Sequence, residues 1–240
     1  MTMEDQTAQR LANFVVEIMK EANGRARVED VISTAAAIVG ERCIEAAGDF
    51  NPRVHTFVPG SRIFSDKIND LISGDVDDWS KVPANCVVGI LRAQITAGPY
   101  DAAELPSLTD VYGGLAASTG DTSSWGWVPL SVPVVNRPTV MPLRIAFETR
   151  EAVDRIVVGI RNDTMRCLRV TTTALAKVLC LAEGVIDHRV ALLLAIETIN
   201  GMAKTAPMTI EALQGVASET KGPEALRPAS NKAKPWWRFW

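Results

Sequence analysis

Hydrophobic residues recur every three to four positions along most of this chain, which is the period of an amphipathic α-helix. In the first segment they occupy positions 11, 14, 15, 18, 19 and 22, and Asn23-Gly24 follows as a stop signal. The same pattern predicts helices over residues 28–47, 61–73, 83–97, 165–183 and 209–218. Residues 153–160 also fit a helix, although the run 156–158 would suit a strand.

Two further helices are predicted from their capping residues. Ser107 and Asp110 have the spacing of a capping box at the start of residues 107–117, and Asp187 precedes the hydrophobic run at 190–196. That run is apolar on every side of a helix, which predicts a place in the middle of the core. In the helix over 28–47, three consecutive alanines and Gly40 would let a second helix approach closely.

The middle of the chain has a different pattern. Residues 99–142 contain six prolines and four glycines, which exclude long helices there. Hydrophobic and other residues then alternate over 128–134 and again over 141–147, on either side of Asn136-Arg137-Pro138. This alternation predicts a β-hairpin, which the prolines would confine to an edge or an isolated ribbon.

The expected fold class is therefore mainly α, a helical core with a β-hairpin-like insertion rich in proline and glycine. We expect a single helical domain over residues 1–220, with the irregular insertion at 99–148, followed by a basic aromatic C-terminal tail at 221–240.

Composition and charge narrow the class of protein. With 47% hydrophobic and 22% charged residues, the 240-residue chain is typical of a globular protein. Its net charge of −3 argues against binding nucleic acid over its whole surface. No secretory signal or hydrophobic run of membrane-spanning length is evident, so the sequence predicts a soluble, cytoplasmic protein.

The pattern of cysteines and histidines predicts neither a cofactor nor a structural metal. Four widely spaced cysteines form no C-x-x-C pair and are expected to be buried free thiols. The two histidines, His55 and His188, stand outside any zinc-binding helical motif. We expect His188 on the surface, whereas His55 lies in a loop between helices, where sites often occur.

Two more loops carry polar groups that suit a ligand. Asp75, Asp77 and Asp78 form an acidic run that could bind a cation, although it lacks the glycine and glutamate of a calcium loop. The alternative is that these negative charges stabilise the N-terminus of the helix that follows. Residues 118–127 combine hydroxyl groups with the indoles of Trp125 and Trp127. If these loops converge with His55, they form a candidate pocket.

The tail is the most unusual feature of the sequence. Three of the six tryptophans lie in the last five residues, which are Trp236, Trp237, Arg238, Phe239 and Trp240. Residues 221–240 hold five basic residues and one acidic residue, a charge of +4, which leaves −7 for the rest of the chain. Such a segment could dock on its own body or a neighbouring subunit, lie on a membrane surface, or stack on single-stranded nucleic acid; we favour the first and consider nucleic acid unfavoured.

Two classes of function follow. The first is a non-catalytic interaction or assembly protein, forming a homo-oligomer or binding a protein partner through the tail. It is favoured because no catalytic motif is present. The alternative is an enzyme or small-molecule-binding protein with a site formed by the loops at 51–60, 75–78 and 118–127.

Overall fold

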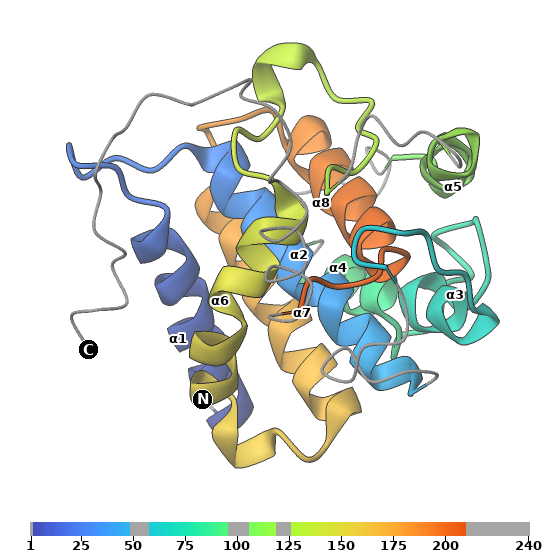
Figure 1. The fold of residues 1–240 in the computed structure, drawn as a ribbon, viewed down its shortest axis with the longest axis horizontal. Coiled ribbons are helices and arrows are strands. Elements are labelled where there is room, and N and C mark those ends of the chain that lie inside the picture. The colour runs from blue at the N-terminus through green and yellow to red at the C-terminus, as the bar shows by residue number, and fades with distance from the viewer. Residues whose placement is uncertain (1, 49–57, 96–105, 119–125, 210–240) are drawn as a thin grey trace, which may run out of the picture. The chain divides into compact units, whose positions relative to one another are not determined.

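The computed structural model describes residues 2–48, 58–95, 106–118 and 126–209, and these are mainly helical, as predicted (Figure 1). No strand of a sheet occurs among the described residues, which contain two isolated β-bridges. The α-helices are α1 (Met3–Ile18), α2 (Val28–Ala47), α3 (Asp66–Ser73), α4 (Val87–Ile95), α5 (Leu108–Ala117), α6 (Pro142–Ile156), α7 (Thr164–Leu181) and α8 (His188–Ala203), with short 3-10 helices η2 (Val134–Asn136) and η3 (Val158–Ile160).

Local signals set most helix ends. The Ser107 hydroxyl accepts a hydrogen bond from the backbone N–H of Asp110 at the start of α5, and the Asp187 carboxylate caps α8, so both predicted caps are confirmed. Gly48 and Gly74 end α2 and α3 in the left-handed conformation that glycine adopts without strain. The start predicted at Ser61 was wrong, because α3 begins only at Asp66.

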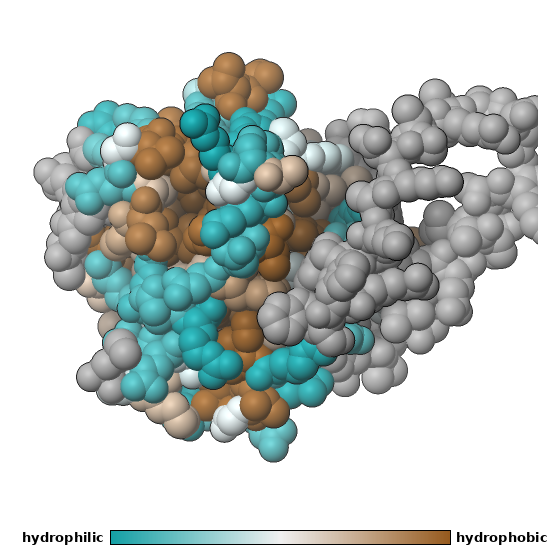
Figure 2. All heavy atoms as spheres, turned by 90° about the vertical axis from the view of Figure 1, so that its left-hand side faces the viewer, coloured by the Kyte–Doolittle hydropathy of each residue, from teal (hydrophilic) through white to brown (hydrophobic). Residues whose placement is uncertain are grey.

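Helix α2 occupies the centre of the described structure. Of its 20 residues, 17 are buried, and it packs against α8, α7 and α6. Figure 1 shows α1 and α6 on one side of α2 and α3 and α5 on the other. On the side of α1, hydrophobic groups lie in several separate areas between hydrophilic ones (Figure 2). The sequence pattern predicted only one buried face for α2, whereas its neighbours enclose it almost completely.

Helices α2 and α8 approach each other closely at Gly40. A Cβ atom added to Gly40 would lie 2.6 Å from the Met202 Cβ and 2.9 Å from both the Ala203 nitrogen and the Ile199 oxygen. Real Cβ atoms do not approach backbone atoms this closely, so only glycine fits here without moving a helix. The predicted close approach of a second helix at this position is confirmed.

We expect Gly40→Ala to destabilise the protein by about 1–3 kcal/mol, because the helices must separate. The matched control is Gly113→Ala in α5, where an added Cβ meets nothing within 4 Å. That variant should instead gain about 0.5–1 kcal/mol from the higher helix propensity of alanine. Urea unfolding followed by circular dichroism measures both, and a gain at position 40 equal to that at position 113 would contradict the close packing.

The hydrophobic run at 190–196 lies within α8, the main packing partner of α2, but it is not buried evenly. Leu192, Leu194 and Ile196 are at most 1% exposed, whereas Val190 and Leu193 are half-buried. The centre of the core is therefore the α2–α8 pair.

The predicted hairpin is wrong. Its second strand, residues 141–147, lies mostly in α6, which starts with Pro142 in the first turn. Proline suits this position because its fixed φ matches the helix and its missing N–H would have no partner there. The buried residues of α6 include Pro142, Ile145, Thr149 and Val153, a helical spacing that the apparent alternation concealed.

Acidic side chains hold the segment predicted as the first strand, residues 128–134, and the residues after the predicted turn. Glu197 of α8 accepts hydrogen bonds from the backbone N–H and the hydroxyl of Ser131. Asp30 of α2 accepts from the backbone N–H and the hydroxyl of Thr139, at 2.6 and 2.7 Å. Carboxylates therefore satisfy backbone groups that a sheet ladder would otherwise have paired.

A network of charges crosses the core between α2 and α6. Arg42 is 3% exposed; its guanidinium lies 3.0 Å from the Asp154 carboxylate and also pairs with Glu45. One position earlier in α2, Glu41 is 4% exposed and pairs with Arg150. Buried charges are costly unless they are paired, so the network favours one arrangement of α6 on α2.

Among the described residues, no helix combines the length and hydropathy needed to cross a membrane. Residues up to Thr209 form one compact unit. The predicted helix at 209–218, the boundary at residue 220 and the tail lie outside the described residues, apart from Thr209 itself.

Candidate interaction surface and buried polar centre

Six aspartates lie on α3, the loop after it and the start of α5. Asp66 and Asp70 are four residues apart on α3 and so lie on one side of that helix. The loop and α5 add the remaining members. We call this surface the acidic face, and it consists of Asp66, Asp70, Asp75, Asp77, Asp78 and Asp110.

Three hydrogen bonds tie α3 and its loop to α5 and the residues before it. The Thr109 hydroxyl donates to Asp77 at 3.1 Å, the Trp79 indole N–H donates to the Pro106 carbonyl at 2.7 Å, and the Tyr112 hydroxyl donates to Ser73 at 2.5 Å. These bonds hold α3 and its loop to residues that lie up to 39 positions later in the sequence.

The acidic face carries more negative than positive charge. Within residues 66–81 and 106–118 the described basic residues are Lys67 and Lys81, and Arg92 lies on the neighbouring α4. Lys81 lies 3.2 Å from Asp78, and Arg92 is directed to the backbone carbonyl of Trp79. Hydrogen bonds from the Ser80 hydroxyl and backbone lower the pKa of Asp78 to about 2. Asp78 therefore stays ionised at neutral pH.

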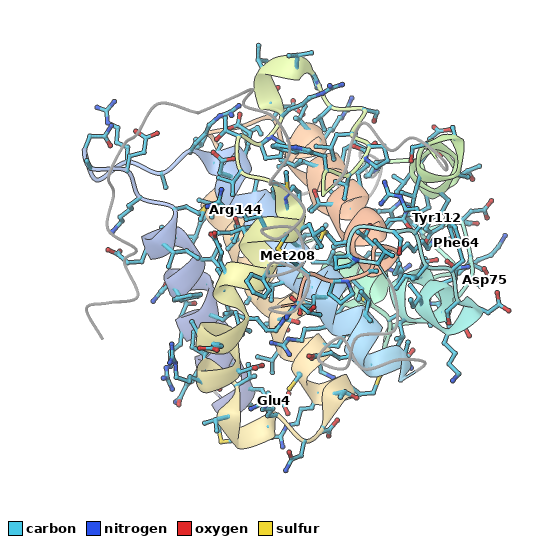
Figure 3. All side chains as sticks on the ribbon, viewed as in Figure 1. Glu4, Phe64, Asp75, Tyr112, Arg144 and Met208 are labelled. Carbon is cyan, nitrogen blue, oxygen red and sulfur yellow. The ribbon has the colours of Figure 1, made fainter. Side chains whose placement is uncertain are left out.

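An exposed aromatic ring adjoins these carboxylates. Phe64 is 61% exposed, although the sequence pattern placed it on the inner side of the predicted helix. It lies before the first turn of α3, so the helical spacing does not apply to it. Figure 3 shows Phe64, Asp75 and Tyr112 on the same side of the molecule. The surface thus offers an apolar contact beside negative charge.

A buried lysine lies behind this surface. Lys204, just after α8, is 6% exposed, and its ammonium group stands 4.9 Å from the centre of the Tyr112 ring. It forms no ion pair with any residue that the structure describes. Burial lowers its pKa to about 8, and the negative charge of Asp75 only partly offsets this effect. Asp75 has a φ of 55°, the one positive value at a described non-glycine residue.

The groups around Lys204 are joined by polar contacts. Burial raises the pKa of Tyr112 to about 12, so its hydroxyl stays protonated and donates to Ser73. No histidine or carboxylate is hydrogen-bonded to Ser73 among the described residues to act as a base. Asn200 donates to the Val111 carbonyl at 3.3 Å, and its buried carbonyl oxygen has no described partner. The centre therefore links α3, α5 and α8 through polar contacts.

We expect Lys204→Met to stabilise the protein at pH 7 by about 1–2 kcal/mol, because methionine keeps the apolar stem and removes a desolvated charge at the loss of a cation–π contact. The folded-state pKa of about 8 lies below the ordinary 10.5, so stability of the unmodified protein is reduced below pH 8 and recovers between pH 8 and 10.5. The advantage of the variant should shrink over the same range in urea unfolding. Destabilisation at pH 7 would contradict an unpaired charge.

Of the site residues predicted from the sequence, the structure describes four and leaves the others outside the described residues. Asp75, Asp77 and Asp78 lie on the acidic face, and Trp127 is half-buried between Gly126, which abuts Met141, and Val128, which abuts Gly201. No hydrogen bond joins Trp127 to the aspartates among the described residues. His55, Trp125 and the five tail residues 236–240 lie outside the described residues, so the convergence of the three loops stays a prediction.

No group of three residues suited to hold a metal ion occurs among those described. All four cysteines are free thiols; Cys43, Cys86 and Cys167 are buried and Cys180 is half-buried. Burial raises the pKa of every one of these thiols, which keeps them protonated and weakly nucleophilic.

Sequence reasoning missed half of the acidic face and the buried lysine. Asp66 and Asp70 carried a usable signal, because two aspartates four residues apart on a predicted helix share one side of it. Asp110 was recognised only as part of a helix cap. Nothing in the local sequence indicated that Lys204 is buried, because its contact with Tyr112 of α5 comes from a distant part of the chain.

Comparison with protein-family models, with curated proteins and with solved structures finds no significant match for this chain.

Proposed function

We propose that this is a non-catalytic interaction protein whose basic aromatic tail, residues 221–240, binds the acidic face of its own chain or of a neighbouring copy. The observation that supports the proposal is the presence of opposite charges on two parts of one sequence. The acidic face has six aspartates, whereas the tail has five basic residues and one acidic residue. Complementary charge of this kind steers association and fixes register.

Aromatic rings supply the affinity that exposed charges do not. Exposed ion pairs contribute about 0–1 kcal/mol each, so charge alone would give a weak complex. The rings at 236–240 can each bury on the order of 150 Å² or more, and Phe64 offers an exposed apolar contact beside the carboxylates. Arg238 lies between the aromatic residues, so a cation accompanies them into contact with the acidic face.

A peptide titration tests this proposal. A fluorescein-labelled peptide of residues 227–240 is added to the chain ending at Leu226, and binding is followed by fluorescence anisotropy at low and high salt. We expect saturable binding that weakens with salt. Asp66→Asn, Asp70→Asn and Asp110→Asn combined should weaken binding at least about tenfold at low salt, because several attractive pairs are lost.

The control variant removes the same number of negative charges, three, at exposed positions away from the acidic face. Glu17→Gln, Glu151→Gln and Glu183→Gln combined should leave binding within about twofold. Equal loss in both variants would mean that the peptide responds only to overall charge. Absence of binding, or binding only to anionic vesicles, would reject the proposal.

The mode of docking sets the oligomeric state. If the tail binds a neighbouring copy, the full chain should form a defined oligomer by sedimentation, while the chain ending at Leu226 should be monomeric. If it binds its own body, both should be monomeric. Either result is compatible with the peptide titration, so the two measurements separate the existence of docking from its route.

A further inference from the structure

A groove opens on another part of the described structure, between the beginning of α1, α4 and α7. Its volume is about 510 Å³, within the range of small-molecule sites. Helix α7 packs against both α1 and α4, and the groove lies where the three meet. Ile90, Ala93 and Gln94 line it from α4, and Arg169, Val170 and Thr173 line it from α7. Each set has helical spacing, so each presents one side of its helix to the groove.

The carboxylates at the rim already have cationic partners. Glu4 lies 2.6 Å from Arg166, and Asp5 lies 3.0 Å from Lys177. Figure 3 shows Glu4 well apart from Asp75, a member of the acidic face, and from the nearby Phe64. The charges of these carboxylates are therefore balanced within the protein, so they do not favour a cationic ligand strongly.

Arg169 differs from these residues because its guanidinium forms no ion pair with a described residue, and its side chain is exposed at the groove. A guanidinium offers five donors in a planar fork that matches a carboxylate or sulfonate. Gln94 donates to the Thr173 hydroxyl at 2.9 Å, which holds the amide in place beside the groove. Ile90, which is half-buried, and Ala93, which is exposed, supply the apolar surface.

We propose that this groove is a binding site for a small organic anion, whose acidic group pairs with Arg169 and whose apolar body lies on Ile90 and Ala93. The site is separate from the acidic face, and the proposal does not depend on docking of the tail.

The test uses two dyes that differ mainly in charge, added to the full chain. 8-Anilinonaphthalene-1-sulfonate carries a sulfonate, and N-phenyl-1-naphthylamine is its neutral counterpart. We expect saturable fluorescence enhancement with the sulfonate dye. Arg169→Gln should weaken its binding about five- to tenfold and change binding of the neutral dye less than twofold. Arg155→Gln, an exposed arginine on α6 outside the groove, is the matched control and should change neither.

A second variant tests the groove itself. Ala93 is exposed on α4, so Ala93→Trp should fold normally while filling the groove and reducing binding of both dyes at least tenfold. Ala116→Trp, at an exposed position of α5, is its control. The proposal is overturned if sulfonate-dye binding is unchanged by both Arg169→Gln and Ala93→Trp, or if Arg169→Gln weakens the neutral dye equally.

Discussion

Replacing Leu194 by aspartate is expected to unfold most of the protein at 25 °C. Leu194 is 0% exposed on α8, in contact with the α2 side of the core. The substitution removes about 2 kcal/mol of apolar burial and places a carboxylate without a partner in the core, for a total cost of about 5 kcal/mol or more. That is as large as the whole stability of many domains of this size.

Leu181→Asp is the matched control, because Leu181 is 62% exposed at the end of α7. It should cost less than about 1 kcal/mol. Leu193, which is half-buried, should give an intermediate loss. Circular dichroism and urea unfolding measure all three, and a folded Leu194→Asp protein of ordinary stability would mean that α8 does not lie in the core.

Asp154→Ala should cost about 3 kcal/mol, because it breaks a buried ion pair and leaves Arg42 with fewer partners. The Asp154 carboxylate lies 3.0 Å from Arg42 and 3.4 Å from Arg161. The Nε atom of Arg42 already has no described hydrogen-bond partner. A guanidinium that is 3% exposed cannot replace the lost carboxylate by bulk water without opening the core.

Glu148→Ala on the same helix is the comparison, since its pair with Arg144 has an exposed partner. Its cost should be at most about 0.5–1 kcal/mol. Thermal unfolding at low and high salt separates the two, because salt screens the exposed pair more than the buried one. Equal losses for both variants would contradict a buried network.

Local signals predicted the helices because each works within a few residues. Asp187 caps α8 and Gly48 ends α2 wherever the rest of the chain lies. The small residues around Gly40 also announced a close neighbour, although not which helix it would be. Such features depend on backbone geometry more than on the partner, so a single sequence reveals them.

The hairpin prediction was wrong because the hydrophobic residues of this segment fit both the two-residue period of a strand and the 3.6-residue period of a helix. Alternation over 141–147 resembled a strand, while Pro142 in the first turn of α6 and the buried residues at 145, 149 and 153 belong to a helix. The deciding information came from outside the segment: Asp30 and Glu197 satisfy the preceding backbone. These partners are over 60 residues away in the sequence.

The charged residues of the core show the same limit. Glu41 and Arg42 look like the solvent side of α2, and only their contacts with Arg150 and Asp154, more than 100 positions later, explain why they are buried. The acidic face likewise combines α3, a loop and α5. Charge and composition suggested that the tail could pair with acidic residues, and the fold shows which aspartates lie on α3, its loop and α5.

The most direct test of the central proposal is photo-crosslinking of the full chain with p-benzoyl-phenylalanine in place of Trp237. After irradiation and proteolysis, mass spectrometry identifies the attached peptides, and mixing isotopically light and heavy chains separates links within a chain from links between copies. If the tail docks on the acidic face, most links should fall in α3, the loop at 74–81 or α5. The combined variant Asp66→Asn, Asp70→Asn and Asp110→Asn should then form fewer of these links. Links concentrated elsewhere on the body, or formed only with added lipid, would contradict it.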